Sequence, residues 1–198
     1  MNRPSGNMTG VTFLSSELTG KRLGLLREMA PLTTTIAYLT DPRVFGSAAM
    51  TKDMLAAARA LGREALILEA RNGFDIDAAF ATLVKSGAGA LVVGPYVPLS
   101  TYRNKIVELA ARHKIPAIYP HRSFVVDGGL MSYDADATAL WRLVGSLYAA
   151  QILNGTKPAD LPVQQPTKFE FVINMQTART LGIEVPPLLL AITDETIE

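Results

Sequence analysis

Short apolar runs, separated by segments with helical periodicity, constrain the fold of this chain most strongly. Four such runs occupy the first two-thirds of the sequence, and each is too short to form a typical helix. The runs are Thr34–Leu39, Ala65–Glu69, Ala90–Val93 and Pro116–Tyr119. Strands that are buried on both faces read as continuous apolar runs, and helical crossovers between them join parallel strands. The pattern therefore predicts an α/β fold built on a doubly wound parallel sheet.

The segments between the runs predict the crossover helices. Apolar residues recur at helical spacing from Ser47 to about Leu61, from Asp75 to about Ser86 and from Ser100 to Arg112. Asp75 can cap the second helix, because a carboxylate accepts hydrogen bonds from the free N–H groups of a first turn and favours the positive end of the helix dipole.

The last third of the chain has a different pattern. A possible strand, Gly128–Tyr133, is followed by a long helix over Ala135–Asn154 and by a strand-like alternation over Lys168–Asn174. Asn174 can cap a further short helix. One face of the long helix is apolar, and we expect its side chains to lack a partner within the chain. These side chains are Leu140, Leu143, Val144, Leu147 and Tyr148.

Composition excludes several classes of function. Hydrophobic residues make up 48% and charged residues 19%, which is typical of a folded domain rather than a disordered chain. The net charge is +1 without a basic run, so we expect no nucleic-acid partner and favour neutral or zwitterionic solutes, or other proteins. The chain has no cysteine, and its two histidines, His113 and His121, cannot complete a metal site alone. We expect no cofactor.

No catalytic motif stands out either. The phosphate-binding pattern GxxxxGK[ST] and the nucleophile elbow GxSxG are both absent. No nucleophile with a neighbouring base, and no catalytic pair of carboxylates, can be recognised. The sequence thus indicates a binding protein rather than an enzyme.

Candidate binding residues follow the predicted strands. In an open parallel sheet, ligands bind beyond the carboxyl ends of the strands. Aromatic faces there can stack on an organic molecule, and charged groups can pair with an ammonium or a carboxylate. Loop solvation explains each residue taken singly, whereas the collection favours a cleft, and we predict that Asp41, Tyr96 and Arg122 line one crevice. The full set is Asp41, Arg71, Tyr96, Tyr119, His121, Arg122 and Tyr133.

Several segments resemble the ABC transporter substrate-binding family that includes tryptophan- and tyrosine-type binding components. Arg3–Val11 is similar to the family's RPGGN-[VI]-TG segment, with Ser5 in place of a glycine. Gly128–Tyr133 is similar to its GGLMSYG segment, with Asp134 in place of the last glycine. The remaining resemblance lies in Glu108–Tyr119, Pro158–Asn174, Thr177–Gly182 and Pro186–Pro187.

The resemblance implies a two-lobed fold of the periplasmic-binding-protein type I kind, here one lobe plus an incomplete part of the other. It implies residues 1–17 as a hinge and remnant of the first lobe, 18–127 as the second lobe, 128–167 as a crossover segment belonging to the first lobe and 168–198 as a return to the second. It also implies that the protein binds a small organic solute, such as an amino acid, between the lobes. The family's partner is an ABC permease and its compartment is the periplasm.

Three expectations concern the chain as written. It begins without an apolar stretch, so we expect no signal peptide and a cytoplasmic location if it is expressed in this form. The apolar face of the helix over residues 135–154 predicts a homodimer, because burying that face against a second copy removes it from water. Two alternatives to transport stay open: a ligand-sensing domain of a regulator, and a truncated product without a transport role.

Overall fold

The computed structural model describes residues 6–12 and 15–198, which form two compact units. Unit 2 comprises residues 15–134 and 171–198, and unit 1 comprises residues 135–170 together with the segment before residue 15. Arg3–Ser5, which begin the first segment of family resemblance, lie outside the described residues. None of the helices within the described ranges is long and apolar enough to span a membrane.

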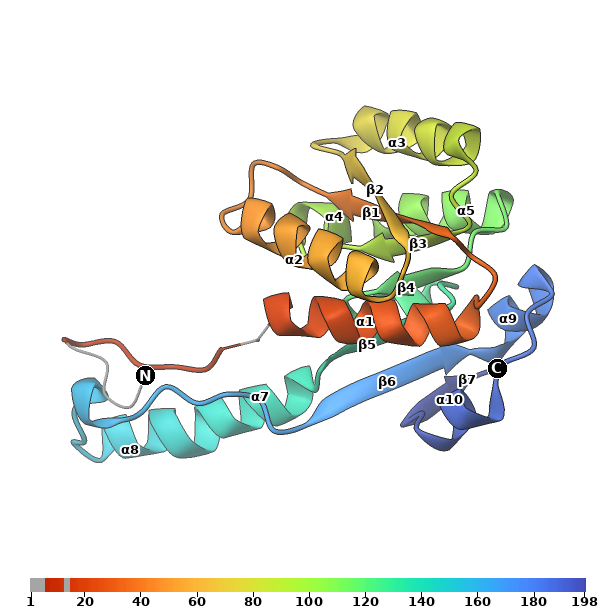
Figure 1. Cartoon of the computed structure of the whole chain (residues 1–198). Helices are drawn as coiled ribbons and strands as arrows, with labels where there is room; N and C mark the ends of the chain where they lie inside the picture. The colour runs from red at the N-terminus through yellow and green to blue at the C-terminus, as the bar shows by residue number, and fades with distance from the viewer. Residues whose placement is uncertain (1–5, 13–14) are drawn as a thin grey trace. The chain divides into compact units, whose positions relative to one another are not determined.

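A seven-stranded sheet carries the fold, with the strand order β2-β1-β3-β4-β5-β6-β7 (Figure 1). Strands β1 to β5 are parallel to one another, as the apolar runs predicted for the first four. Each strand matches a predicted run within a few residues, except that β7 was not predicted. The strands are β1 (Thr35–Thr40), β2 (Glu64–Glu69), β3 (Ala90–Val93), β4 (Ala117–Tyr119), β5 (Met131–Ala135), β6 (Phe169–Asn174) and β7 (Glu195–Ile197).

The last two strands run in the opposite direction. The N–H of Asn174 donates to the carbonyl of Leu130 and the N–H of Asp136 donates to that of Lys168, so residue numbers rise along β5 while they fall along β6. Strand β7 is parallel to β6. The carboxyl ends of β1 to β5 therefore lie at the same edge of the sheet as the amino ends of β6 and β7.

Helices cover both faces of the sheet in unit 2, which confirms the doubly wound arrangement. Along β1, Ile36 and Tyr38 belong to one buried cluster whereas Ala37 and Leu39 belong to the other, because successive side chains point to opposite faces. The first cluster takes residues from α1 (Ser15–Met29), α2 (Ser47–Ala60), α9 (Met175–Leu181) and α10 (Pro187–Ala191). The second takes residues from α3 (Gly73–Ser86), α4 (Val97–Thr101), α5 (Arg103–Arg112) and α6 (Arg122–Val126).

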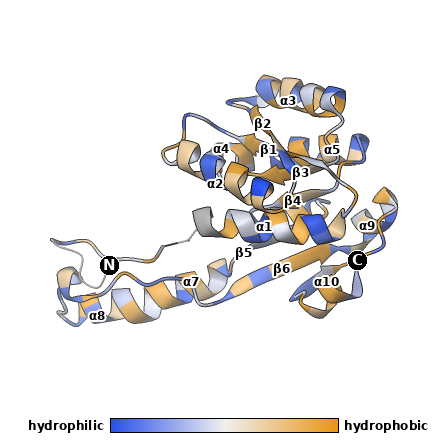
Figure 2. Cartoon of the chain, viewed as in Figure 1, coloured by the Kyte–Doolittle hydropathy of each residue, from blue (hydrophilic) through white to orange (hydrophobic). Residues whose placement is uncertain are grey.

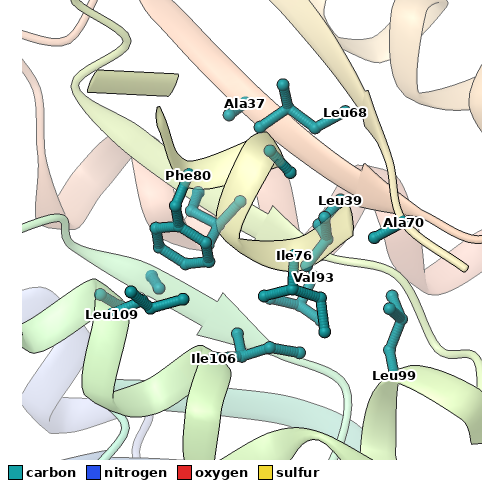
Figure 3. Packing of buried hydrophobic residues seen from close by; sticks show 14 of the residues in the cluster. Ala37, Leu39, Leu68, Ala70, Ile76, Phe80, Val93, Leu99, Ile106 and Leu109 are labelled. Carbon is teal, nitrogen blue, oxygen red and sulfur yellow. The ribbon is translucent and has the colours of Figure 1, made fainter. Parts of the chain in front are cut away.

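Figure 3 shows how the second cluster packs. Ile76 and Phe80 of α3 lie beside Ile106 and Leu109 of α5, over the side chains of the central strands. Burying a side chain of this size contributes about 1.5–3 kcal/mol to folding. Hydrophobic colouring is concentrated on the strands, whereas the helices carry both hydrophobic and hydrophilic positions (Figure 2).

Two helix predictions need correction, and three helices were not predicted. The cap of α3 is Asn72 rather than Asp75: its side-chain oxygen accepts from the N–H groups of Phe74 and Asp75, so the helix begins two residues earlier. The helix predicted from Ser100 is two helices, α4 and α5, which meet at Tyr102. Helices α1, α6 and α10 were not predicted.

Unit 1 is built around the predicted long helix. Helix α7 (Ala137–Leu143), a π-helical turn, η1 (Val144–Ala149), and α8 (Ala150–Leu153) follow one another without a break. Asp136 caps the start by accepting from the N–H of Ala139. The segment from Thr9 to Thr12 pairs with residues 161–164, and η2 (Pro158–Asp160) precedes that pairing.

The apolar face of this helix is less exposed than the sequence suggested. Leu140 and Tyr148 are buried, and the Tyr148 hydroxyl donates to the carbonyl of Pro162 at 2.6 Å. The expectation that all five side chains lack a partner is therefore wrong, because residues after the helix fold back onto it. Trp141, on another face of the helix, is 66% exposed.

Candidate functional site

The carboxyl edge of β1 to β5 is where the seven candidate residues were expected, and all seven lie on or directly after these strands. Their side chains do not form one group. Three of them, His121, Arg122 and Tyr133, lie on β5 or directly after the neighbouring strand β4, where His121 contacts Asp134 and Arg122 contacts Glu195. The other four lie elsewhere, in the core or at the ends of β1 and β2.

A chain of hydrogen bonds centred on Asp134 is the most connected feature of this edge. Nδ1 of His121 lies 2.7 Å from Oδ2 of Asp134. The other carboxylate oxygen, Oδ1, accepts from Nη2 of Arg22 at 3.3 Å, and Nε of Arg22 donates to the carbonyl of Tyr133 at 2.7 Å. Exposure rises along the chain, from 1% for the Arg22 side chain to 17% for Asp134 and 43% for His121. The network thus links the protein interior to a side chain that a solute can reach.

Arg22 reaches this edge from α1, where it shares the buried side of the helix with Leu18, Leu26 and Met29. Burial lowers the pKa of the Arg22 guanidinium, and the neighbouring Asp134 carboxylate opposes that change. A buried charge is stable only when it is paired and hydrogen-bonded. The bonds to Tyr133 and Asp134 meet that requirement.

Arg122 forms the second polar group of the edge. Its Nε donates to Oε2 of Glu195 at 2.8 Å, and its Nη2 bonds the other carboxylate oxygen. This hydrogen bonding holds the pKa of Glu195 below its ordinary value. The pairing exists because β7 begins at the edge where β4 ends, so residues 73 positions apart meet.

Tyr133, which precedes Asp134 on β5, offers an aromatic surface. Its ring meets Phe171 edge-on, with centroids 6.3 Å apart, and Nζ of Lys21 lies 6.0 Å from its ring centroid. Burial raises the pKa of the Tyr133 hydroxyl. The ring is half-buried, so one part of it remains accessible.

Asp41 and Arg71 lie at the other end of the edge. The Asp41 carboxylate is fully buried and accepts from Nε and Nη2 of Arg43 at 3.0 and 2.7 Å, and these bonds lower its pKa. The Arg71 side chain is exposed and pairs with Glu69 at 3.3 Å. Both candidate residues are thus engaged by neighbours on their own loops.

Tyr96 and Tyr119 are each 1% exposed and belong to the hydrophobic core. The Tyr96 hydroxyl lies 3.2 Å from that of Tyr38, and the Tyr119 ring stacks on Phe124 at 4.9 Å between centroids. Neither ring offers surface to a solute in this structure. Asp41 and Tyr96 are buried, whereas the Arg122 side chain is partly exposed and pairs with Glu195. These three side chains were predicted to line one crevice, and among the described residues they do not contact one another.

Sequence reasoning missed three residues that organise the edge: Arg22, Arg43 and Glu195. A signal existed for Arg22, since Leu18, Arg22, Leu26 and Met29 recur at helical spacing and mark it as an arginine on an apolar face. No comparable signal singles out Arg43 or Glu195, because their partners are set by loop conformation and by the position of β7.

Two hollows in the structure lie away from the candidate residues. In unit 1, a groove of about 390 Å³ lies between α7 and residues 164–168. In unit 2, a hollow of about 460 Å³ lies at the opposite edge of the sheet, near Gly128 and Thr177. Within the part of the chain that the structure describes, no three His, Asp or Glu side chains gather as they would around a metal ion. The chemistry of the candidate edge is hydrogen bonding, charge pairing and aromatic contact.

Comparisons of the sequence and of the structure find similar proteins. The sequence model of the family described as ABC transporter substrate binding protein matches residues 1–197. A structure of an ABC domain in complex with L-Trp from Streptococcus pneumonia superposes with a TM-score of 0.85 at 25% identity, covering 99% of this chain and 67% of that one. A search of curated proteins gave no match.

Two further structures show the same fold. A conserved domain protein from Vibrio cholerae has a TM-score of 0.88 at 22% identity, covering 98% of this chain. A ligand-free, open substrate binding protein with adhesive properties from Clostridium difficile has a TM-score of 0.75 at 21% identity, covering 100%. The chain spans 64% of the length of each of these two structures. A LacI family transcriptional regulator from Bifidobacterium animalis is a more distant match, with a TM-score of 0.61 at 14% identity.

Proposed function

Because the chain belongs to the ABC transporter substrate binding protein family, we propose that it is a non-catalytic solute-binding component of an ABC importer. Its solute is a small organic molecule of the amino-acid class, and its partner is an ABC permease. The site of action is the periplasm. The family match over nearly the whole chain carries this proposal.

The candidate edge supports an amino-acid solute. His121 and Arg122 are polar and partly exposed, and the ring of Tyr133, on the strand next to β4, is half-buried. An amino acid has an ammonium, a carboxylate and a side chain, so it can use hydrogen bonds, charge and aromatic contact at once. The L-Trp complex of the Streptococcus structure adds support for this class of solute.

The division into lobes belongs to the same proposal. Residues 18–127 and 168–198 form the second lobe, residues 128–167 belong to the first lobe, and residues 1–17 act as a hinge. Polar groups at the carboxyl edge of the sheet then form one wall of an interlobe cleft. This agrees with the rule that ligands of open α/β sheets bind beyond the carboxyl ends of the strands.

Titration of the ¹⁵N-labelled chain with the twenty amino acids, followed by amide correlation spectra, tests the proposal. We expect at least one amino acid to shift the signals of His121, Arg122 and Tyr133, with saturation. Thr177, at the opposite edge of the sheet, is the internal control and should not shift. A folded chain whose spectrum responds to no amino acid contradicts the proposal.

A ligand-sensing domain of a regulator is the second candidate, because the LacI family regulator shares the fold. The same titration, with sugars added to the panel, distinguishes an importer component from a regulator domain. A response to sugars alone favours the sensor.

A further inference from the structure

The network from Arg22 through Asp134 to His121 has a consequence for how the candidate site recognises its solute. An ionised carboxylate only accepts hydrogen bonds, so the Asp134 oxygen 2.7 Å from Nδ1 of His121 requires a proton on Nδ1. In a neutral imidazole, Nε2 is then the unprotonated nitrogen and acts as an acceptor. Among the described residues, Nε2 has no hydrogen-bond partner.

Asp134 is itself held in place from the interior. Its second oxygen accepts from Nη2 of Arg22, and Nε of Arg22 fixes the carbonyl of the preceding residue, Tyr133. With 1% of its side chain exposed, Arg22 cannot touch a solute. Two bonds from one rigid guanidinium orient both the strand end and the carboxylate.

We propose that Arg22 is a positioning residue which, through Asp134, holds His121 with Nδ1 protonated and presents Nε2 as a hydrogen-bond acceptor for a donor group of the solute. The ammonium group of an amino acid is a donor of this kind. The solute-binding part of this inference rests on the proposed function, whereas the state of the His121 ring does not.

The ring state can be measured directly. Long-range ¹H–¹⁵N correlation of the labelled chain at about pH 8, above the ordinary imidazole pKa of about 6.5, reports which nitrogen carries the proton. We expect the Nδ1-protonated tautomer for His121. The second histidine, His113, follows α5 with its ring 6.5 Å from that of Phe80, and it serves as a control that the variants should not change.

Variants of Arg22 and Asp134 show whether Arg22 positions His121 or only stabilises the fold. Asp134→Ala should abolish the tautomer preference of His121, and so should Arg22→Met, whereas Arg22→Lys should restore it in part. Loss of stability in Arg22→Met with an unchanged His121 tautomer contradicts the proposal. If Arg22→Met does not fold, Asp134→Asn decides: its amide oxygen can still accept from Arg22, so the buried guanidinium keeps a partner, while its NH2 group replaces the carboxylate oxygen that faces Nδ1 of His121 and should remove the preference for a proton on Nδ1.

Affinity for L-tryptophan, or for another amino acid that binds, completes the test. Removing an acceptor for a charged donor weakens binding by about tenfold or more, so we expect this loss in His121→Gln and in Asp134→Ala but not in His113→Gln. Unchanged affinity in both of the first two variants overturns the proposal while the proposed function stands. An Nδ1-protonated His121 in a chain that binds no amino acid supports the positioning network and contradicts the proposed function.

Discussion

The hydroxyl oxygens of Tyr38 and Tyr96 lie 3.2 Å apart in the interior of unit 2, where neither side chain is more than 1% exposed. Tyr38 lies on β1, and Tyr96 directly precedes α4, after β3. Burial is the main reason why the pKa of Tyr38 lies well above its ordinary value, and the hydrogen bond to Tyr96 is the second reason. The hydrogen bond between the two hydroxyl groups fastens the loop after β3 to the neighbouring strand.

This pair gives a prediction about stability. Tyr96→Phe leaves the Tyr38 hydroxyl without this partner in the core, so we expect a loss of about 1–3 kcal/mol in the free energy of unfolding. The double variant Tyr38→Phe/Tyr96→Phe removes both polar groups and should recover part of the loss. Urea unfolding of the wild type, both single variants and the double variant measures the coupling. Strictly additive effects would show that the bond contributes nothing.

Gly129 predicts a strong steric effect. A Cβ at this position would lie 2.6 Å from Cε2 of Tyr119 and 2.7 Å from the carbonyl oxygen of Phe124, and a backbone atom cannot move aside easily. We expect Gly129→Ala to lower the free energy of unfolding by about 1–3 kcal/mol. Gly24→Ala is the matched control, because Gly24 lies within α1 with nothing within 4 Å of the added carbon. It should stabilise the chain by about 0.4–1 kcal/mol, and a similar loss in both variants contradicts the steric argument.

Asp41 predicts a pH dependence of stability. Hydrogen bonds from Arg43 lower its pKa in the folded chain, whereas in the unfolded chain the value is about 3.9. The contribution of the pair is therefore fully present above about pH 4 and is lost as the pH falls through the lowered value. We expect Arg43→Met to be less stable than the wild type at pH 7, with the difference shrinking below about pH 4.

Urea unfolding of both chains at about pH 7, 5 and 3 measures this difference. Arg27→Met is the control, because Arg27 pairs with Glu28 on the exposed surface and such pairs contribute little. A difference between wild type and Arg43→Met that stays constant over this range would rule out the assigned role of Asp41.

The homodimer through residues 135–154 remains a prediction, and the exposed side chains of the helix make it testable. Trp141, the only tryptophan, is 66% exposed and Leu153 is 87% exposed. We expect light scattering to give the mass of two chains and the fluorescence of Trp141 to shift to the blue as concentration rises. Trp141→Glu should give one chain, whereas Leu188→Glu, on the exposed side of α10, should not change the mass. A single-chain mass for the wild type contradicts the dimer.

Much of the sheet could be predicted because most strands are marked by an apolar pattern in their own residues. The run Ala90–Val93 was placed to the residue, since a strand that is buried on both faces must be apolar throughout. Helix α1 could also have been predicted from its spacing, but it was not recognised. Strand β7 could not, because three residues near the end of the chain carry no pattern of their own and become a strand only by pairing with β6.

For the candidate site too, one part could be predicted from the sequence and another part could not. The sequence by itself determined that polar residues follow the strand ends, because strand direction and the crossover helices place those residues at one edge. Only the tertiary structure decided which of them face solvent: Tyr96 turns into the core to meet Tyr38, whereas His121 turns outward to meet Asp134. A side chain's direction depends on partners that are distant in sequence, such as Arg22, which is 112 residues from Asp134. Local periodicity contains no information about such pairings, because they form only when the folded sheet and its helices bring the groups within hydrogen-bonding distance.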